Sequence, residues 1–431
     1  MKLRHIIAVL PLVIIGITSC KKSSTSTTTT SSTTTLTKFY VINDSVVDGL
    51  DEYTFTIDND ANTIYNEDSL PYLCRVDSLI PTIYGSTIKT ITINDTIVYT
   101  GNDTIDFSRP VTVKTLATDG ESTRTYIVTV NVHQVDPDEY SWAGIKSEIF
   151  SGITATSQKT LWHNNQLLHF VATDSETLLF TSKDGIDWAQ QTVTGLPTAA
   201  NVSGIVALGD TLFSAIDGTL YATATPTTWT TQGTATGITQ LAFAMNDQLF
   251  ALGEADGARC MFVRDTAWTN LGTLPEQFPV SDFATCVDAE PSGKMRAYLI
   301  GGKASDGTPL GTVWSSNDGA YWANLAASKQ WFTPRYGAAV VQYADGLMLF
   351  GGADANGECT DRQLFSVDYG LTWATPDDKA LLPDLWVSRH DLNVVKDDEN
   401  RLYIVGGTAG TTTLSDVWSG QKNSEIPGFT K

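Results

Sequence analysis

Short stretches in which apolar and polar residues alternate dominate the chain after Leu36. Examples are YTFTI at Tyr53–Ile57, IKTITI at Ile88–Ile93 and RTYIVTVNVH at Arg124–His133. A period of two in segments rich in Val, Ile, Thr and Tyr indicates half-buried strands. Turn-forming groups such as DND, GND and TDGES separate the stretches, and no helical period is evident. The pattern therefore predicts an all-β protein.

The first strands suit a small domain of their own. About a hundred residues of alternating strands are typical of a β-sandwich. We place this sandwich at residues 37–134 and expect it to be Ig-like. The segment QVDPDEY, Gln134–Tyr140, has the composition of a linker.

From Trp142 onward a longer repeat replaces this pattern. A tryptophan recurs at intervals of 39 to 54 residues, and three units contain an apolar strand that ends in Gly-Gly. Such intervals match propeller blades of four strands each. We therefore predict a six-bladed β-propeller over residues 139–431, with seven blades as the alternative. The recurring residues are Trp142, Trp188, Trp229, Trp268, Trp322 and Trp373.

The two ends of this repeat complement each other. The last unit, His390–Lys431, has three strand-like stretches and lacks a closing Trp strand, whereas the spare strand YSWAGI, Tyr140–Ile145, precedes the first unit. Pairing of the two would close the ring and remove exposed strand edges. We predict that Tyr140–Ile145 completes the last blade.

Two short patterns resemble known propeller families. The run Pro334-Arg335-Tyr336-Gly337, followed by AAVV and LMLFGG, resembles a kelch repeat. The run SVDYGLTW, Ser366–Trp373, resembles the Asp-box of sialidase-like propellers, and SKDGIDW and SNDGAYW are close variants. Ser and Asp can bond the backbone of a tight turn, Gly tolerates positive φ, and Trp packs between sheets. We therefore interpret the motif as structural, with the residues Ser182, Asp184, Gly185, Trp188, Ser316, Asp318, Gly319, Trp322, Ser366, Asp368, Gly370 and Trp373.

The N-terminus resembles that of a bacterial lipoprotein. Lys2 and Arg4 precede an apolar run that is too short to span a bilayer, and the run ends in Ile-Thr-Ser-Cys20. This resemblance implies a signal peptide at residues 1–19 and lipid on Cys20. A Ser/Thr-rich segment follows, so we expect residues 20–36 to be a disordered tether. An ordinary secretory signal is the alternative.

Charge and cysteine content exclude several functions. The chain carries 48 Asp and Glu against 27 Lys and Arg, a net charge of −21, so nucleic acid is not an expected partner. Four cysteines beyond Cys20 are far apart, without the spacing of a zinc site. We expect no metal and no cofactor, and we favour free thiols over disulfides. These cysteines are Cys74, Cys260, Cys286 and Cys359.

Two adjacent units place a Trp and an Arg directly before their innermost strand, in WFTPRYG and WVSRHD. That connection lies at the rim of a propeller channel, where aromatic rings suit sugars and Arg suits carboxylates. The alternative is that the Trp residues pack between blades and the Arg residues pair with nearby acids. The candidate ligand-binding residues are Arg335, Arg389, Trp331, Trp386, Tyr336, His390 and Arg362.

Enzymatic interpretations have weaker support. A sialidase needs three arginines around a carboxylate, and FTPRYG does not match the motif that supplies the first, although Arg335, Arg362 and Arg389 could share a face. A copper oxidase would need more histidines, and no phosphate-binding loop, dinucleotide motif or nucleophile elbow is present. We therefore assign no catalytic residues.

The whole order resembles a family of Bacteroidetes lipoproteins of unknown function. The order is lipobox, tether, a sandwich that ends in IDFSRPVTVKTLATDGESTRTYIVTVNVHQVDPD, and propeller. The resemblance implies a lipid-anchored protein of the outer membrane, on its periplasmic side or at the cell surface. We expect non-catalytic recognition of a glycan or an envelope protein. The alternatives are a glycoside hydrolase or lyase, and a structural subunit of an envelope complex.

Overall fold

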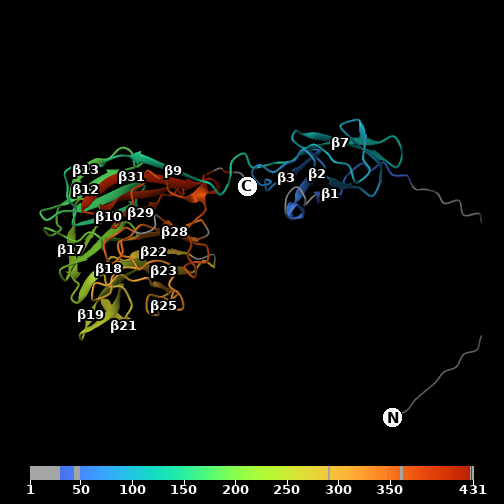
Figure 1. The fold of residues 1–431 in the computed structure, drawn as a ribbon. Coiled ribbons are helices and arrows are strands. Elements are labelled where there is room, and N and C mark those ends of the chain that lie inside the picture. Colours follow the sequence, from blue (N-terminus) through green and yellow to red (C-terminus); the bar gives the residue numbers. More distant parts are fainter. Residues whose placement is uncertain are drawn as a thin grey trace, which may run out of the picture. The chain divides into compact units, whose positions relative to one another are not determined.

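The computed structural model describes residues 30–42, 49–289, 292–344, 346–359, 363–427 and 429. Contacts divide the chain into two compact units, Met1–Val132 and His133–Lys431. The described residues form strands and three short 3-10 turns, η1 (Leu50–Glu52), η2 (Asp378–Ala380) and η3 (Asn423–Glu425), and they contain no α-helix (Figure 1). None of these turns is long or apolar enough to cross a membrane. The predicted all-β class is confirmed.

Unit 1 is a β-sandwich of two sheets around one core. The larger sheet has the order β2-β3-β8-β7-β5-β6 and the smaller one pairs β1 with β4. All neighbours run antiparallel except β3 and β8, which are parallel. The strands are β1 (Lys38–Val41), β2 (Phe55–Asp58), β3 (Thr63–Asn66), β4 (Pro81–Tyr84), β5 (Ile88–Ile93), β6 (Ile97–Val98), β7 (Val111–Ala117) and β8 (Thr123–Thr129).

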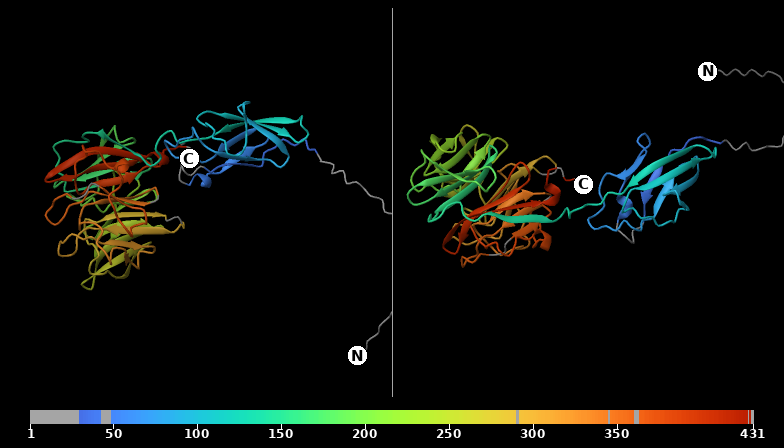
Figure 2. Two further views of the ribbon diagram at one scale, coloured as in Figure 1. Left: turned by 45° about the vertical axis from the view of Figure 1, so that its right-hand side comes forward. Right: turned by 90° about the horizontal axis from the view of Figure 1, so that it is seen from above.

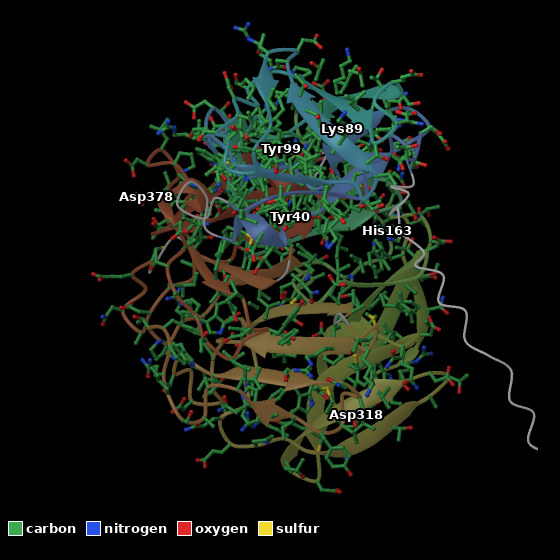
Figure 3. The ribbon with its side chains drawn as sticks, turned by 90° about the vertical axis from the view of Figure 1, so that its right-hand side faces the viewer. Tyr40, Lys89, Tyr99, His163, Asp318 and Asp378 are labelled. Carbon is green, nitrogen blue, oxygen red and sulfur yellow. The ribbon has the colours of Figure 1, made fainter. Side chains whose placement is uncertain are left out.

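The hydroxyl groups of two tyrosines packed in this core form hydrogen bonds with the surrounding chain. The Tyr126 hydroxyl donates to Asn59 Oδ1 at 2.6 Å and accepts from the Leu36 N–H at 3.0 Å. The Tyr99 hydroxyl, labelled in Figure 3, donates to the Pro81 carbonyl at 2.9 Å and accepts from the Ile83 N–H at 3.0 Å. Burial of a phenol is favourable when its hydroxyl finds such partners.

The last residues of the expected tether belong to the sandwich. Leu36 is buried in the core, and the Thr34 carbonyl accepts a hydrogen bond from the Thr115 hydroxyl at 2.8 Å. The expectation of a disordered segment up to residue 36 is wrong for these residues, because a buried apolar side chain and hydrogen bonds of the backbone anchor them. Composition alone does not reveal such anchoring in a Ser/Thr-rich run.

Unit 2 is a propeller of six sheets, which confirms the predicted fold and blade number. In each blade the chain runs up and down through successive antiparallel strands (Figure 1). The strands of blades 1 to 3 are β10 (Ser157–His163), β11 (Gln166–Ala172), β12 (Thr177–Ser182), β13 (Ala189–Thr192), β14 (Val206–Leu208), β15 (Thr211–Ile216), β16 (Thr219–Thr223), β17 (Thr230–Thr234), β18 (Ile238–Met245), β19 (Gln248–Ala255), β20 (Ala258–Arg264) and β21 (Trp268–Thr273).

The last three blades follow the same plan with one shortened member. Blade 5 has a sheet of three strands, and its fourth position is reduced to an isolated bridge between Phe365 and Ala374. Pro376 follows at once and cannot donate to a ladder, which accounts for the early end. The strands are β22 (Ala284–Ala289), β23 (Met295–Ile300), β24 (Val313–Ser316), β25 (Ala323–Asn324), β26 (Ala339–Tyr343), β27 (Gly346–Phe350), β28 (Gln363–Ser366), β29 (Asn393–Lys396), β30 (Leu402–Ala409) and β31 (Thr412–Lys422).

Strand β9 (Tyr140–Lys146) closes the ring, as the sequence predicts. It pairs antiparallel with β31 (Figure 2). In this register Trp142 lies opposite Gly420. A Cβ at Gly420 would collide with the Trp142 ring, so glycine makes room for the indole. The indole N–H donates to the Ala380 carbonyl at 2.9 Å, which also joins β9 to blade 5.

We expect Trp142→Ala to destabilise unit 2 by about 3 kcal/mol, because it removes a large packed side chain at the closure. Gly420→Val should have a comparable effect through the collision with the same ring. Thermal unfolding measures both, and Tyr321→Ala is the matched control, since that ring is 83% exposed. Unchanged unfolding of both closure variants would contradict the importance of this pairing.

Candidate functional site at the propeller axis

The lead-in to the innermost strands of blades 4, 5 and 6 is built alike. Asp282, Gly337 and Asp391 have φ of 53°, 63° and 54°, in the left-handed region that Gly and Asp tolerate best. The Gly337 N–H donates to the Asp282 carbonyl at 2.8 Å, and the Asp391 N–H donates to the Gly337 carbonyl at 2.6 Å. A chain of backbone bonds thus joins three blades at the start of their inner strands.

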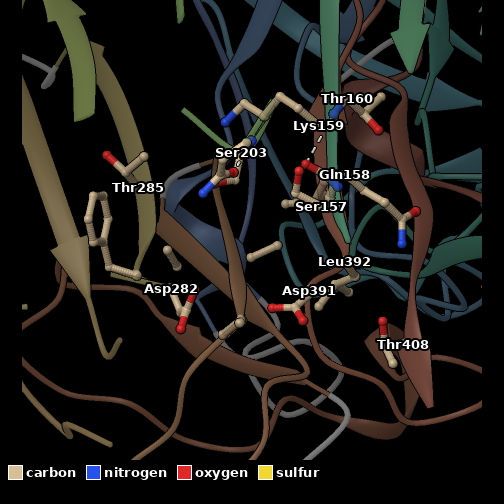
Figure 4. A pocket seen from close by; sticks show the side chains of 18 of the residues that line it. Ser157, Gln158, Lys159, Thr160, Ser203, Asp282, Thr285, Asp391, Leu392 and Thr408 are labelled. Carbon is tan, nitrogen blue, oxygen red and sulfur yellow. Dashed lines mark hydrogen bonds between the residues drawn. The ribbon is translucent and has the colours of Figure 1, made fainter. Parts of the chain in front are cut away.

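These inner strands surround a cavity of about 240 Å³ on the propeller axis (Figure 4). Every blade contributes residues to the wall, and many of these residues have polar or charged side chains. Three of the lining residues are charged: Lys159, Asp282 and Asp391. The uncharged polar members are Thr156, Ser157, Gln158, Thr160, Asn201, Ser203, Gln240, Thr285, Asn393 and Thr408.

A group of five side chains gathers where the inner strands begin, and we call it the mouth cluster: Asp282, Lys303, Tyr336, His390 and Asp391. Lys303 Nζ lies 2.8 Å from Asp282 Oδ2 and 3.8 Å from the centre of the Tyr336 ring. The Tyr336 and His390 rings are 5.5 Å apart, and His390 Nδ1 lies 2.8 Å from Asp391 Oδ2. Two predicted site residues, Tyr336 and His390, are therefore brought together.

The electrostatics of the mouth cluster keep Lys303 charged. Burial acts to lower the pKa of its ammonium, but the hydrogen bond and the negative charge of Asp282 outweigh burial, so the pKa is raised. Cation, carboxylates and aromatic ring together offer hydrogen-bond donors, acceptors and an apolar face within one small area.

The two arginines that the sequence assigned to ligand binding are not accessible. Arg335 and Arg389 are both 0% exposed. The Arg335 guanidinium donates to the carbonyls of Thr333 and Gly351, at 3.1 and 3.0 Å. This part of the prediction is wrong, because a side chain that is fully buried and donates to backbone carbonyls does not present its guanidinium to a ligand.

Arg389 donates to carbonyls in the same way and also forms an ion pair with Asp416. It donates to the carbonyls of Val387 and Gly406 at 2.8 and 3.1 Å, and its two terminal nitrogens contact the two carboxylate oxygens of Asp416. The guanidinium lies 5.0 Å from the centre of the Trp386 ring, which is 2% exposed. The alternative that the sequence left open, Trp packing and Arg–acid pairing, describes this blade.

Trp331, a further predicted ligand residue, does not line the cavity. Trp331 is half-buried and lies 3.7 Å from Lys329 Nζ, measured to the ring centre, outside the cavity lining. Arg362 lies outside the described residues. Because Arg335 and Arg389 are buried, the three arginines do not form the exposed triad that a sialidase would need.

The Ser-x-Asp turns have the geometry of a structural motif. In blade 1 Ser182 Oγ accepts from the Gly185 N–H at 2.9 Å, and Asp184 Oδ1 accepts from Ile186 and Asp187 at 2.9 and 3.0 Å. The bonds from Asp187 and then Ile186 hold the pKa of the Asp184 carboxyl below its usual range. The Trp188 indole N–H closes the turn on the Gly185 carbonyl at 2.8 Å.

The same turn recurs in blades 4 and 5. Gly319 and Gly370 donate to the serine hydroxyls at 2.8 and 2.7 Å, and the indoles of Trp322 and Trp373 donate to the glycine carbonyls. Each turn joins the third strand of its blade to the chain that follows. By the up-and-down order, these turns lie at the opposite face from the mouth cluster; Asp318 is labelled in Figure 3.

The thiols do not form a reactive site. Cys74, Cys260, Cys286 and Cys359 are free, and burial raises the pKa of the Cys286 thiol to about 12. A thiol with a raised pKa is a poor nucleophile. Within the described ranges, no three His, Cys, Asp or Glu side chains converge as a metal site would require.

The family comparison agrees with this architecture. The model of the DUF6242 beta propeller domain matches residues 136–431, and that of the DUF6242 N-terminal domain, a domain of unknown function, matches residues 22–130. The chain belongs to the DUF6242 family. No curated protein matches the sequence. Among solved structures, "Structure of YjhT" is similar at 14% identity and a TM-score of 0.45, over 63% of this chain and 96% of that chain.

Sequence reasoning missed four charged residues of the DUF6242 propeller site: Asp282, Lys303, Asp391 and Lys159. Asp282 and Asp391 occupy the place of Gly337 in SDFAT, YGAAVV and HDLNVV, so alignment of the units could have found them. Lys159 in SQKTLWH has no such signal, because nothing in its neighbourhood marks the strand as lining an axis.

In the DUF6242 propeller we expect Asp416→Ala to lower stability by about 3 kcal/mol, because it leaves the Arg389 guanidinium buried without its acid. Arg389→Lys should also destabilise, since an ammonium cannot reproduce the two-pronged contact. Thermal unfolding measures both, with Lys379→Ala as the control, because it removes an ion-pair cation that is exposed. Should Asp416→Ala unfold like the wild type, Arg389 would not depend on this pair.

Proposed function

We propose that the propeller is a non-catalytic binding module that recognises a glycan at the mouth cluster. The observation that carries this proposal is the position of Tyr336 between Lys303 and His390, with the carboxylates of Asp282 and Asp391 beside them. Carboxylates accept hydrogen bonds from sugar hydroxyls, and aromatic rings contact the apolar faces of sugars. The site adjoins a cavity, as ligand sites generally do.

The arrangement favours binding over catalysis. Each acid of the mouth cluster already has a cationic or imidazole partner, at 2.8 Å in both cases. A glycosidase uses one carboxyl group as an acid and another as a base or nucleophile, in environments that separate their pKa values. Turnover of a fluorogenic sugar panel by the wild-type protein would support the hydrolase alternative instead. Co-purification with an envelope complex, without glycan binding, would support a structural role.

The proposal also includes a location for the protein in the cell. The lipoprotein-like N-terminus supports an export signal and lipid on Cys20, which would display the propeller at the outer membrane. The acidic composition of the chain suits an exported, soluble domain on such an anchor. The membrane and a glycan are therefore the two expected partners.

We expect Tyr336→Ala to weaken binding of a glycan found on a glycan array by about tenfold or more, because it removes the aromatic anchor of the mouth cluster. Tyr336→Phe keeps the ring and should retain most of the affinity. Calorimetry measures both, and Tyr321→Ala controls for loss of an exposed tyrosine at the opposite face. Equal affinity of wild type and Tyr336→Ala, or an array without any hit, would contradict the proposal.

We expect Cys20→Ser to move the protein from the membrane fraction to the soluble fraction, because a serine cannot take the thioether-linked lipid. Fractionation of cells and the intact mass of the purified protein measure this change. Cys74→Ser is the matched control and should remain in the membrane fraction. An intact wild-type mass that equals the unmodified chain would contradict lipidation.

A further inference from the structure

Lys159 is a cation in the axial cavity that the mouth cluster does not use. It is the third residue of β10, the innermost strand of blade 1, and it lines the cavity with its neighbours on that strand. In Figure 4 its side chain extends from β10 toward Ser203. Among the described residues, its ammonium group has neither an ion-pair nor a hydrogen-bond partner.

The other two charges of the cavity wall are paired. Asp282 pairs with the Lys303 ammonium, and Asp391 is hydrogen-bonded to the His390 ring, so both acids have partners at the mouth. Lys159 is therefore the charged residue of the described lining that has no partner, and its ammonium is available to an anionic group. An ammonium placed in a cavity without a counter-ion is costly, which makes such a position a candidate for ligand recognition.

Further polar atoms of the same wall lack partners in the described structure. The hydroxyl of Thr285, the side-chain oxygen of Gln158 and the side-chain nitrogen of Asn393 are buried and unpaired. All three residues line the cavity. Buried polar groups are normally hydrogen-bonded, so these atoms are unusual, but they are closed to solvent and are not themselves contacts for a guest.

The protonation state of Lys159 suits the binding of an anion. Desolvation lowers its pKa to about 8, so the ammonium form still predominates at pH 7. Its attraction for an anion is strengthened by the same removal of water. A volume of about 240 Å³ admits a guest of on the order of ten non-hydrogen atoms, roughly the size of one sugar unit.

We propose that the axial cavity binds a small carboxylate-bearing molecule the size of a sugar acid, with its carboxylate on the Lys159 ammonium. The hydroxyl and amide groups of the wall serve the remaining polar atoms of the guest. This inference rests on the proposed function in that the guest is a sugar derivative entering beside the mouth cluster.

The test uses the full-length protein in mild detergent and calorimetry with galacturonate and glucuronate, against galactose and glucose. The wild type should bind at least one acid about tenfold more tightly than its neutral counterpart. Lys159→Met should lose about tenfold or more in affinity for that acid, and Lys159→Arg should keep most of it. Lys183→Met, in an exposed turn of the opposite face, is the matched control.

A second readout does not depend on how the variant folds. Acetylation of the wild-type protein, followed by mass spectrometry, should show that the bound acid protects Lys159 and leaves Lys183 reactive. Thermal unfolding of Lys159→Met shows whether any loss of affinity reflects loss of fold. Absence of protection of Lys159 by an acid that binds would overturn the proposal.

The two proposals fail in different ways. If neither acid binds, or if Lys159→Met binds both acids like the wild type, the cavity inference is wrong whatever happens at Tyr336. If Tyr336→Ala keeps its affinity for every glycan while Lys159→Met loses the acids, the mouth proposal fails and the cavity site stands. Equal binding of acids and neutral sugars also contradicts a role for the Lys159 charge.

Discussion

The pairing of β9 with β31 is the constraint on which the rest of the propeller depends. It places the first residues of unit 2 at the outer edge of its last blade and so brings blade 6 beside blade 1. Side chains across that junction then meet: the Thr160 N–H donates to Asn393 Oδ1 at 3.1 Å, and Gln158 donates to the Gly407 carbonyl at 3.4 Å. An open chain of blades would have two exposed sheet edges and no enclosed axis.

The Gly-Gly pairs and the buried arginines together hold neighbouring blades in contact. Gly302 and Gly352 donate their N–H groups to the carbonyls of Arg335 and Arg389 in the next blade, at 2.8 and 2.9 Å. A Cβ at Gly351 would collide with the Arg389 carbonyl, so this close approach of backbones needs glycine. Each arginine then reaches back to a glycine carbonyl of its own blade. The arginine before the inner strand therefore stabilises the contact between blades. A guanidinium in this position is buried and does not contact a ligand.

The proposed binding function uses the charges that the fold leaves accessible. At the face of the Ser-x-Asp turns, the aspartate carboxylates accept hydrogen bonds from backbone N–H groups of their own turns. At the other face, Asp282 and Asp391 stand in left-handed positions that double as links between blades, so their carboxylates are held at the cavity mouth by the same geometry that joins the sheets. Lys159 differs from both sets, because no structural contact of the described residues explains its charge.

Alternation of apolar and polar residues, the Trp period and the spare YSWAGI strand were sufficient to predict the all-β class, the six blades and the closure, because these depend on local period and on the need to remove sheet edges. The same local signals failed where contacts are distant in sequence. Leu36 looks like the end of a tether until the core of the sandwich surrounds it. Arg335 and Arg389 look like ligand residues until their hydrogen bonds to the carbonyls of Gly351 and Gly406 are seen. Only the tertiary structure decided which charged side chains are buried in packing contacts and which line the cavity. The reason is that six inner strands converge on one axis, and the sequence does not indicate which side chains will meet there.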